Sequence, residues 1–138
     1  GSPELKHRMN SNSILNYIDK AEYLKALYPD GLAFEGSLSE ITFHRDGPSI
    51  TLSFHLSELP GQKPRQWKDP FNRVLVVLQF FDLQQISLRQ WGTLNQIKLH
   101  FEKVDDLNVI SIEGNECEMD FKAKWIIFKS ISPYLSES

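Results

Sequence analysis

The chain has a single cysteine, Cys117, and no long apolar run. One cysteine excludes an intramolecular disulfide, as expected of a protein in a reducing cytosol. The longest apolar run, Val74–Leu78, is far shorter than the ~20 residues needed to cross a bilayer. From Met9 onward no basic segment precedes an apolar one, so no secretory signal is expected. These absences predict a cytoplasmic protein without a membrane span.

Basic charge and catalytic motifs are also scarce. The chain has 15 lysines and arginines against 18 acidic residues, a net charge of −3, whereas general nucleic-acid binders are usually basic. The nucleophile-elbow, zinc-protease, phosphate-loop and dinucleotide motifs are absent. His44 and His55 are expected on outward faces of a hairpin, without the three or four ligands of a zinc site. We therefore expect no enzyme activity, cofactor, metal or nucleic-acid partner.

Alternation of apolar and polar residues is the strongest pattern that is present. Over Cys117–Phe128 the odd positions up to Trp125 are apolar, and the even positions up to Lys124 are charged. Period-two alternation indicates half-buried β-strands, and it recurs at Glu40–His44, Ser49–Leu56 and Gln96–Glu102. About eight strands with turn signals between them predict a mainly-β domain. We expect an antiparallel meander that forms a sandwich or an open barrel.

Residues 9–138 are expected to form this single β-rich domain, and residues 1–8 to be an expression-tag remnant. Asp19 stands three residues before Glu22, a spacing typical of a capping box at a helix start. Pro29 and Gly31 favour a stop soon afterwards. The sequence therefore predicts one short N-terminal amphipathic helix that docks on the sheet, since so short a helix is not stable alone.

Inward positions of the predicted strands should form one continuous core. Those positions are Ile41, Phe43, Ile50, Leu52, Phe54, Val76, Leu78, Leu99, Phe121 and Trp125. Cys117 shares the inward face and is predicted to be a buried thiol. Asp82 is expected to lie in a turn between two strands. The proline-rich segment Ser57–Asn72 is expected to be the longest loop.

The segment from Glu102 to Asp120 contains seven acidic residues and only one base, Lys103. One interpretation is that turns and solvent faces carry charge for solubility and to protect strand edges. The other is an acidic surface that attracts a partner protein with a basic active site. Trp67, beside Arg65 in the long loop, is the tryptophan expected to be exposed and suited to an interface. The candidate partner-binding residues are Asp105, Asp106, Glu113, Glu116, Glu118, Asp120 and Trp67.

Three segments of the chain carry a resemblance to a known family. They are Phe34–Leu56 (FEGSLSEITFHRDGPSITLSFHL), Trp67 with Phe71–Leu88 (FNRVLVVLQFFDLQQISL), and Met119–Leu135 (MDFKAKWIIFKSISPYL). In order and hydrophobic rhythm they resemble the immunity protein 50 family of bacterial polymorphic-toxin systems. The resemblance implies a small cytoplasmic protein that binds a cognate toxin and blocks it. It implies no catalytic residues.

Two functions therefore remain open from the sequence. The first is an immunity protein that neutralises a toxin enzyme by stoichiometric occlusion. The alternative is a β-barrel or sandwich domain that binds a ligand, or a small enzyme of unknown substrate. An inhibitor should have a solid core and a functional outer face, whereas a ligand binder should have a pocket with convergent polar groups.

Overall fold

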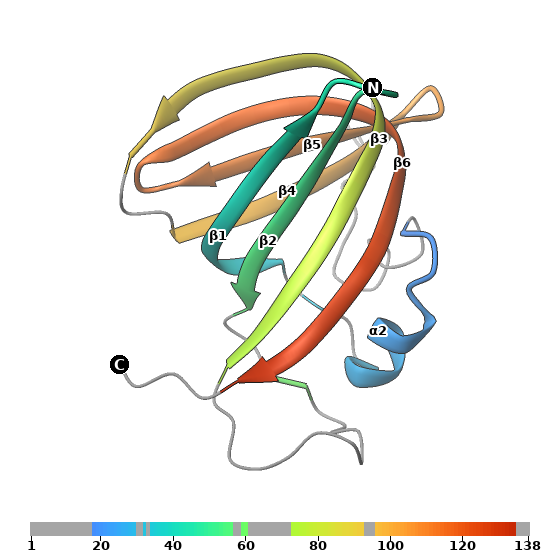
Figure 1. The fold of residues 1–138 in the computed structure, drawn as a ribbon, viewed down its shortest axis with the longest axis vertical. Coiled ribbons are helices and arrows are strands. Elements are labelled where there is room, and N and C mark those ends of the chain that lie inside the picture. The colour runs from blue at the N-terminus through green and yellow to red at the C-terminus, as the bar shows by residue number, and fades with distance from the viewer. Residues whose placement is uncertain are drawn as a thin grey trace, which may run out of the picture.

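Six antiparallel strands and one short helix make up the described part of the protein (Figure 1). The computed structural model describes residues 18–29, 32, 34–56, 59–60, 73–92 and 96–134. The helix is α2, Glu22–Leu27. The strands are β1 (Glu35–His44), β2 (Ser49–Leu56), β3 (Arg73–Trp91), β4 (Gln96–Val104), β5 (Leu107–Gly114) and β6 (Cys117–Tyr134). The predicted mainly-β fold with one N-terminal helix is confirmed.

The strands close into a ring in the order β1, β2, β3, β6, β5, β4. The ring depends on its shortest ladder, in which Glu35–Ser37 of β1 pair with Gln96–Lys98 of β4. Gly36, within this ladder, also lets β1 lie close to β2 on its other side, because a Cβ there would collide with the main-chain oxygen of His55. An exposed ion pair, 3.6 Å from Nζ of Lys98 to Oε2 of Glu35, lies at the same closure. The sheet is therefore a barrel that is closed by only a few residues of β1.

β3 and β6 are the longest strands, and both bend around the barrel (Figure 1). The expected turn at Asp82 is wrong, since β3 runs unbroken from Arg73 to Trp91. Asp82 has a left-handed φ of 57°. The ladder continues across it, because Phe81 pairs with Trp125 and Leu83 pairs with Ala123. Asp82 thus lies within the bend of one strand, and the described strands number six rather than about eight.

Trp125 is not a core residue, and that prediction is wrong. Its side chain is 48% exposed. At the bend of β6 the alternation slips by one residue, so Ala123 and Ile126 are buried while Lys124 and Trp125 between them are exposed. Lys124 Nζ lies 5.6 Å from the centre of the Trp125 ring on the outside of the barrel. Strict alternation assumes an unbent strand, which β6 is not.

Phe43 also lies outside the core, so the prediction that it is a core residue is wrong. It pairs with buried Ile50 across β1 and β2, so its inward direction was right. However, β1 leaves β4 after Ser37, and Phe43 is 53% exposed. Ile41 is only partly buried against the core. The inner face of β1 is thus uncovered towards the end of the strand.

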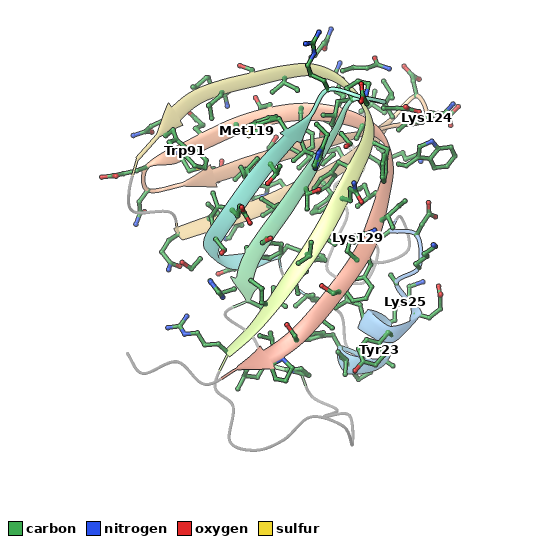
Figure 2. All side chains as sticks on the ribbon, in the orientation of Figure 1. Tyr23, Lys25, Trp91, Met119, Lys124 and Lys129 are labelled. Carbon is green, nitrogen blue, oxygen red and sulfur yellow. The ribbon has the colours of Figure 1, made fainter. Side chains whose placement is uncertain are left out.

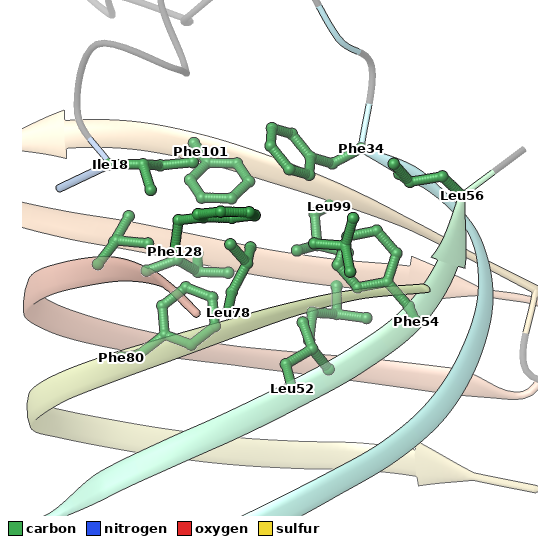
Figure 3. Packing of buried hydrophobic residues seen from close by; sticks show 14 of the residues in the cluster. Ile18, Phe34, Leu52, Phe54, Leu56, Leu78, Phe80, Leu99, Phe101 and Phe128 are labelled. Carbon is green, nitrogen blue, oxygen red and sulfur yellow. The ribbon is translucent and has the colours of Figure 1, made fainter. Parts of the chain in front are cut away.

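The core itself is a continuous apolar cluster inside the barrel (Figure 3). The other predicted core residues are all buried: Ile50, Leu52, Phe54, Val76, Leu78, Leu99 and Phe121. Phe80 meets Phe121 edge-on at 5.0 Å between ring centres, and Phe34 lies 5.4 Å from Phe101. Full burial of each such side chain contributes about 1.5–3 kcal/mol. Apolar side chains therefore fill the interior.

The helix docks as expected, but its start differs from the prediction. The expected capping box of Asp19 and Glu22 is wrong, because Ala21 is the N-cap and no side chain caps the helix. Asp19 instead forms a parallel bridge to β6: its N–H donates to the carbonyl of Ile126 at 2.8 Å, and its carbonyl accepts from Phe128 at 3.0 Å. Leu24 and Leu27 of α2 then join the core cluster. Backbone pairing with the sheet thus replaces local capping.

Candidate functional site

The interior holds little polar chemistry among the described residues. Asn108 is the main exception at 2% exposed: its Nδ2 donates to the carbonyl of Lys124 at 3.2 Å, and its Oδ1 has no partner there. Cys117 is buried, as predicted, and burial raises the pKa of its thiol. Within the described ranges, no helix is long and apolar enough to cross a membrane. The chemistry that a partner can meet therefore lies on the outside.

The histidines of the hairpin do not come together. His44 pairs with Ser49 and His55 pairs with Ser37, so they lie at opposite ends of the β1–β2 ladder. Burial and the nearby charge of Arg73 lower the pKa of His55. In the part of the chain that the structure covers, no group of three or more His, Cys, Asp and Glu side chains can hold a metal ion.

The structure divides the candidate acidic residues into two groups. Asp105 and Asp106 form the turn between β4 and β5, both with left-handed φ. The other four lie around the opposite end of β5, where Glu113 pairs directly with Glu118 across β5 and β6. We call these four the acidic cluster: Glu113, Glu116, Glu118 and Asp120. The predicted acidic segment is therefore two separate surface features.

Arg89 lies against the acidic cluster and was not singled out from the sequence. Its Nη1 donates to Oδ2 of Asp120 at 2.6 Å, and its Nε lies 3.4 Å from Oε1 of Glu118. The register of β3 shifts between Leu88 and Gln90, which makes Arg89 an extra residue opposite β6. The hydrogen bond that Arg89 donates lowers the pKa of Asp120, and one donated by Ser111 adds to this. Alternation alone cannot locate such a bulge.

Cross-strand contacts hold the rest of the cluster. His100 Nε2 lies 3.2 Å from Oε1 of Glu113, between neighbouring β4 and β5. Glu116 follows the β5 strand, and its side chain lies so close to Gly92 that a Cβ on Gly92 would collide with it. Each exposed ion pair contributes little by itself. Glu113 lies on β5 and Glu118 and Asp120 lie on β6, whereas Glu116 lies in the turn between these strands.

A shallow polar groove lies beside the acidic cluster on the outer face. Its volume is about 380 Å³. The lining residues are Gln85, Ser87, Arg89, Val109, Ser111, Asp120, Phe121 and Lys122. Because Lys122 and Arg89 stand beside Asp120, the groove carries both signs of charge. It offers hydrogen-bonding groups to a protein surface rather than an enclosed ligand pocket.

A second hollow is apolar, and we call it the apolar cleft. It is lined by Ile41 and Phe43 of β1, Leu88 and Trp91 of β3, and Met119 of β6, with a volume of about 130 Å³. Figure 2 labels Trp91 at the end of β3 and Met119 on the neighbouring strand. Phe43 and Trp91 are both 53% exposed, and Leu88 is 50% exposed. This cleft was not predicted from the sequence, because Phe43 was expected in the core.

Trp67, the remaining candidate, lies outside the described residues, as does nearly all of the long loop predicted at Ser57–Asn72. Trp91 and Trp125 are the described tryptophans, and both are about half exposed. They lie in different places, since Trp91 lines the apolar cleft while Trp125 is outside the bend of β6. Trp91 is thus the tryptophan that the structure places in a hollow.

Comparison with known proteins identifies a family. The sequence model of the immunity protein 50 family matches residues 20–134, which include α2 and all six strands. No curated protein and no solved structure matched the chain. The match spans most of the chain, in agreement with the resemblance seen in its segments. The protein therefore belongs to the immunity protein 50 family.

Proposed function

We propose that this immunity protein binds a cognate bacterial toxin one to one in the cytoplasm and neutralises it by occlusion. The observation that carries the proposal is the family match over residues 20–134. The filled barrel supports it, because buried apolar side chains occupy the interior and leave the polar chemistry on the outer face. The apolar cleft has no convergent polar side chains, so the structure favours a protein partner over a small polar ligand.

The acidic cluster is the proposed contact for a toxin that is basic around its active site. Glu113 and Glu118 face each other across β5 and β6, and Arg89 orients Glu118 and Asp120. Carboxylates held on adjacent strands present a fixed negative surface, which speeds encounter with a positive one. Asp105 and Asp106 remain a separate proposed contact at the other end of β5, and Trp67 remains a third.

Association kinetics with the purified cognate toxin test the contact. Glu118→Lys should slow association about three- to tenfold at low salt, and the difference should shrink as salt rises. Glu22→Lys on α2 is the matched control, since it makes the same charge change at an exposed site away from the cluster. Asp105→Lys tests the turn separately.

The outcomes separate the two parts of the proposal. Equal association rates for Glu118→Lys and Glu22→Lys would remove the acidic cluster as a contact while leaving toxin binding intact. Absence of any complex with the wild-type protein would remove the proposed function itself.

A further inference from the structure

The apolar cleft opens between two strands that lack a neighbour on one side. In the described ladders, β1 pairs with β4 only at Glu35–Ser37, so Leu38 and Glu40–His44 pair with β2 alone, with a register shift between them. β3 pairs with β2 only as far as Phe81, so its last part pairs with β6 alone. Unpaired strand edges present N–H and C=O groups that can pair with another chain. Both strands contribute side chains to the cleft.

Of the two edges, β1 is the better template for an added strand. The register of β3 shifts twice in its last part, between Gln84 and Ser87 and between Leu88 and Gln90. Bulges of this kind disrupt the regular spacing of an edge and protect it from pairing. From Glu40 to His44, by contrast, β1 pairs with β2 residue for residue without a shift. Its free edge therefore keeps the spacing that an incoming strand needs.

The cleft between these edges has the size and lining for one large apolar side chain. Its volume is about 130 Å³, and a protein cavity of about 150 Å³ holds one benzene ring. Phe43 and Trp91 contribute from β1 and β3, and both are half exposed. Half-exposed aromatic residues around a hollow are typical of the anchor sites that dominate binding energy.

Charge beside the cleft indicates what else the partner carries. Trp91 pairs with Cys117, and the next pair along the ladder is Gln90 with Glu118. Glu116 lies against Gly92, the residue that follows Trp91. The acidic cluster therefore lies around the same end of β6 as the cleft but on its outer face, since Glu118 alternates with Met119, which lines the cleft. A segment that fills the cleft and then passes over this end of β6 would meet these carboxylates if it carried a lysine or arginine there.

We propose that the apolar cleft receives an extended basic segment of the toxin, which adds a strand to Glu40–His44 of β1. One large apolar side chain of that segment enters the cleft between Phe43 and Trp91. Backbone hydrogen bonds along β1 supply affinity, and the cleft supplies specificity. This inference rests on the proposed function and identifies the part of the surface that binds the toxin.

Binding of the cognate toxin domain, catalytically inactivated, tests the cleft. Trp91→Ala should weaken the complex about 30-fold or more, as expected of an anchor residue. Trp125→Ala is the matched control, because Trp125 is 48% exposed but lies outside the bend of β6; it should change affinity less than about threefold. Leu88→Ser gives a second cleft variant, and unchanged circular dichroism shows that each variant folds.

Hydrogen exchange of the same complex tests the added strand. Toxin binding should slow exchange of the free-edge amides of Glu40–His44 at least about tenfold. Equal affinities for Trp91→Ala and Trp125→Ala, or unchanged exchange in β1, would overturn the inference while toxin binding stands. A wild-type dimer that Trp91→Ala dissociates would also overturn it, since the occupant would then be a second copy. No binding by the wild type would remove the proposed function and this inference together.

Discussion

Arg89 on β3 and Asp120 on β6 are joined by a 2.6 Å hydrogen bond between residues 31 positions apart in the chain. The same guanidinium contacts Glu118, two residues away on β6. Because β3 and β6 form the longest ladder of the barrel, this contact joins charges on two extensively paired strands. The surface that a partner meets is therefore an ordered set of opposite charges, not a loose acidic run.

The contact predicts a change in the acid range of stability. Arg89 lowers the pKa of Asp120 below its unfolded value, so the contribution of this carboxylate is present at neutral pH. It is lost as pH falls through the lowered folded pKa, when Asp120 takes up a proton. Arg89→Met should therefore be slightly less stable than the parent at pH 7, with a difference that shrinks and disappears as the pH falls below the lowered folded pKa of Asp120. Urea unfolding at several pH values measures this.

A difference between the two proteins that stays constant, or grows on acidification, would show that Arg89 acts through packing of its side chain instead. Lys98→Met is a suitable control, because Lys98 pairs with Glu35 at the barrel closure and does not touch Asp120.

A substitution in the core should cost more stability than the loss of this surface contact. Phe54 is fully buried, and its ring lies 6.1 Å from that of Phe34. Phe54→Ala should lower the free energy of unfolding by about 3–5 kcal/mol, through lost burial and the cavity that remains. Phe43→Ala removes the same atoms from a site that is 53% exposed, and it should cost less than about 1 kcal/mol. Similar losses in denaturant titrations of the two variants would mean that the inner face of β1 is covered.

Much of the fold could be predicted where strands run straight. The row Ile50, Leu52, Phe54 and the inward face from Cys117 to Ala123 follow strict alternation, and all of these residues are buried. The core prediction for Trp125 is wrong because β6 bends there. The core prediction for Phe43 is wrong because β1 extends beyond its pairing with β4. The prediction that Asp19 caps the helix is wrong because the backbone of Asp19 pairs with β6 instead. Each of these outcomes depends on tertiary geometry, which a local sequence pattern does not encode.

The site was harder to predict than the fold. An acidic segment is visible in composition, but its division into a turn pair and a cluster depends on strand register. Glu113 meets Glu118 only because β5 and β6 pair at that point. Arg89 reaches these carboxylates because β3 has a bulge there. The apolar cleft exists because the end of β1 is not paired with β4. Each of these features follows from how strands end and shift.

Cys117 offers a measure of how firmly the barrel is closed. It is fully buried, and burial raises the pKa of its thiol, so little reactive thiolate is present at pH 8. The native protein should react with a thiol reagent much more slowly than the protein unfolded in urea. The reaction should accelerate only as unfolding begins. Rapid modification without denaturant would contradict the burial of this end of β6.

The stoichiometry of inhibition tests whether the protein protects by occupying its toxin. The activity of purified toxin should be measured against increasing amounts of this protein, at a toxin concentration well above the dissociation constant of the complex. We predict a linear loss of activity that is complete near one equivalent. The triple variant of His44, His55 and His100 to glutamine should give the same line. Full protection at strongly substoichiometric amounts would require turnover and would contradict occlusion.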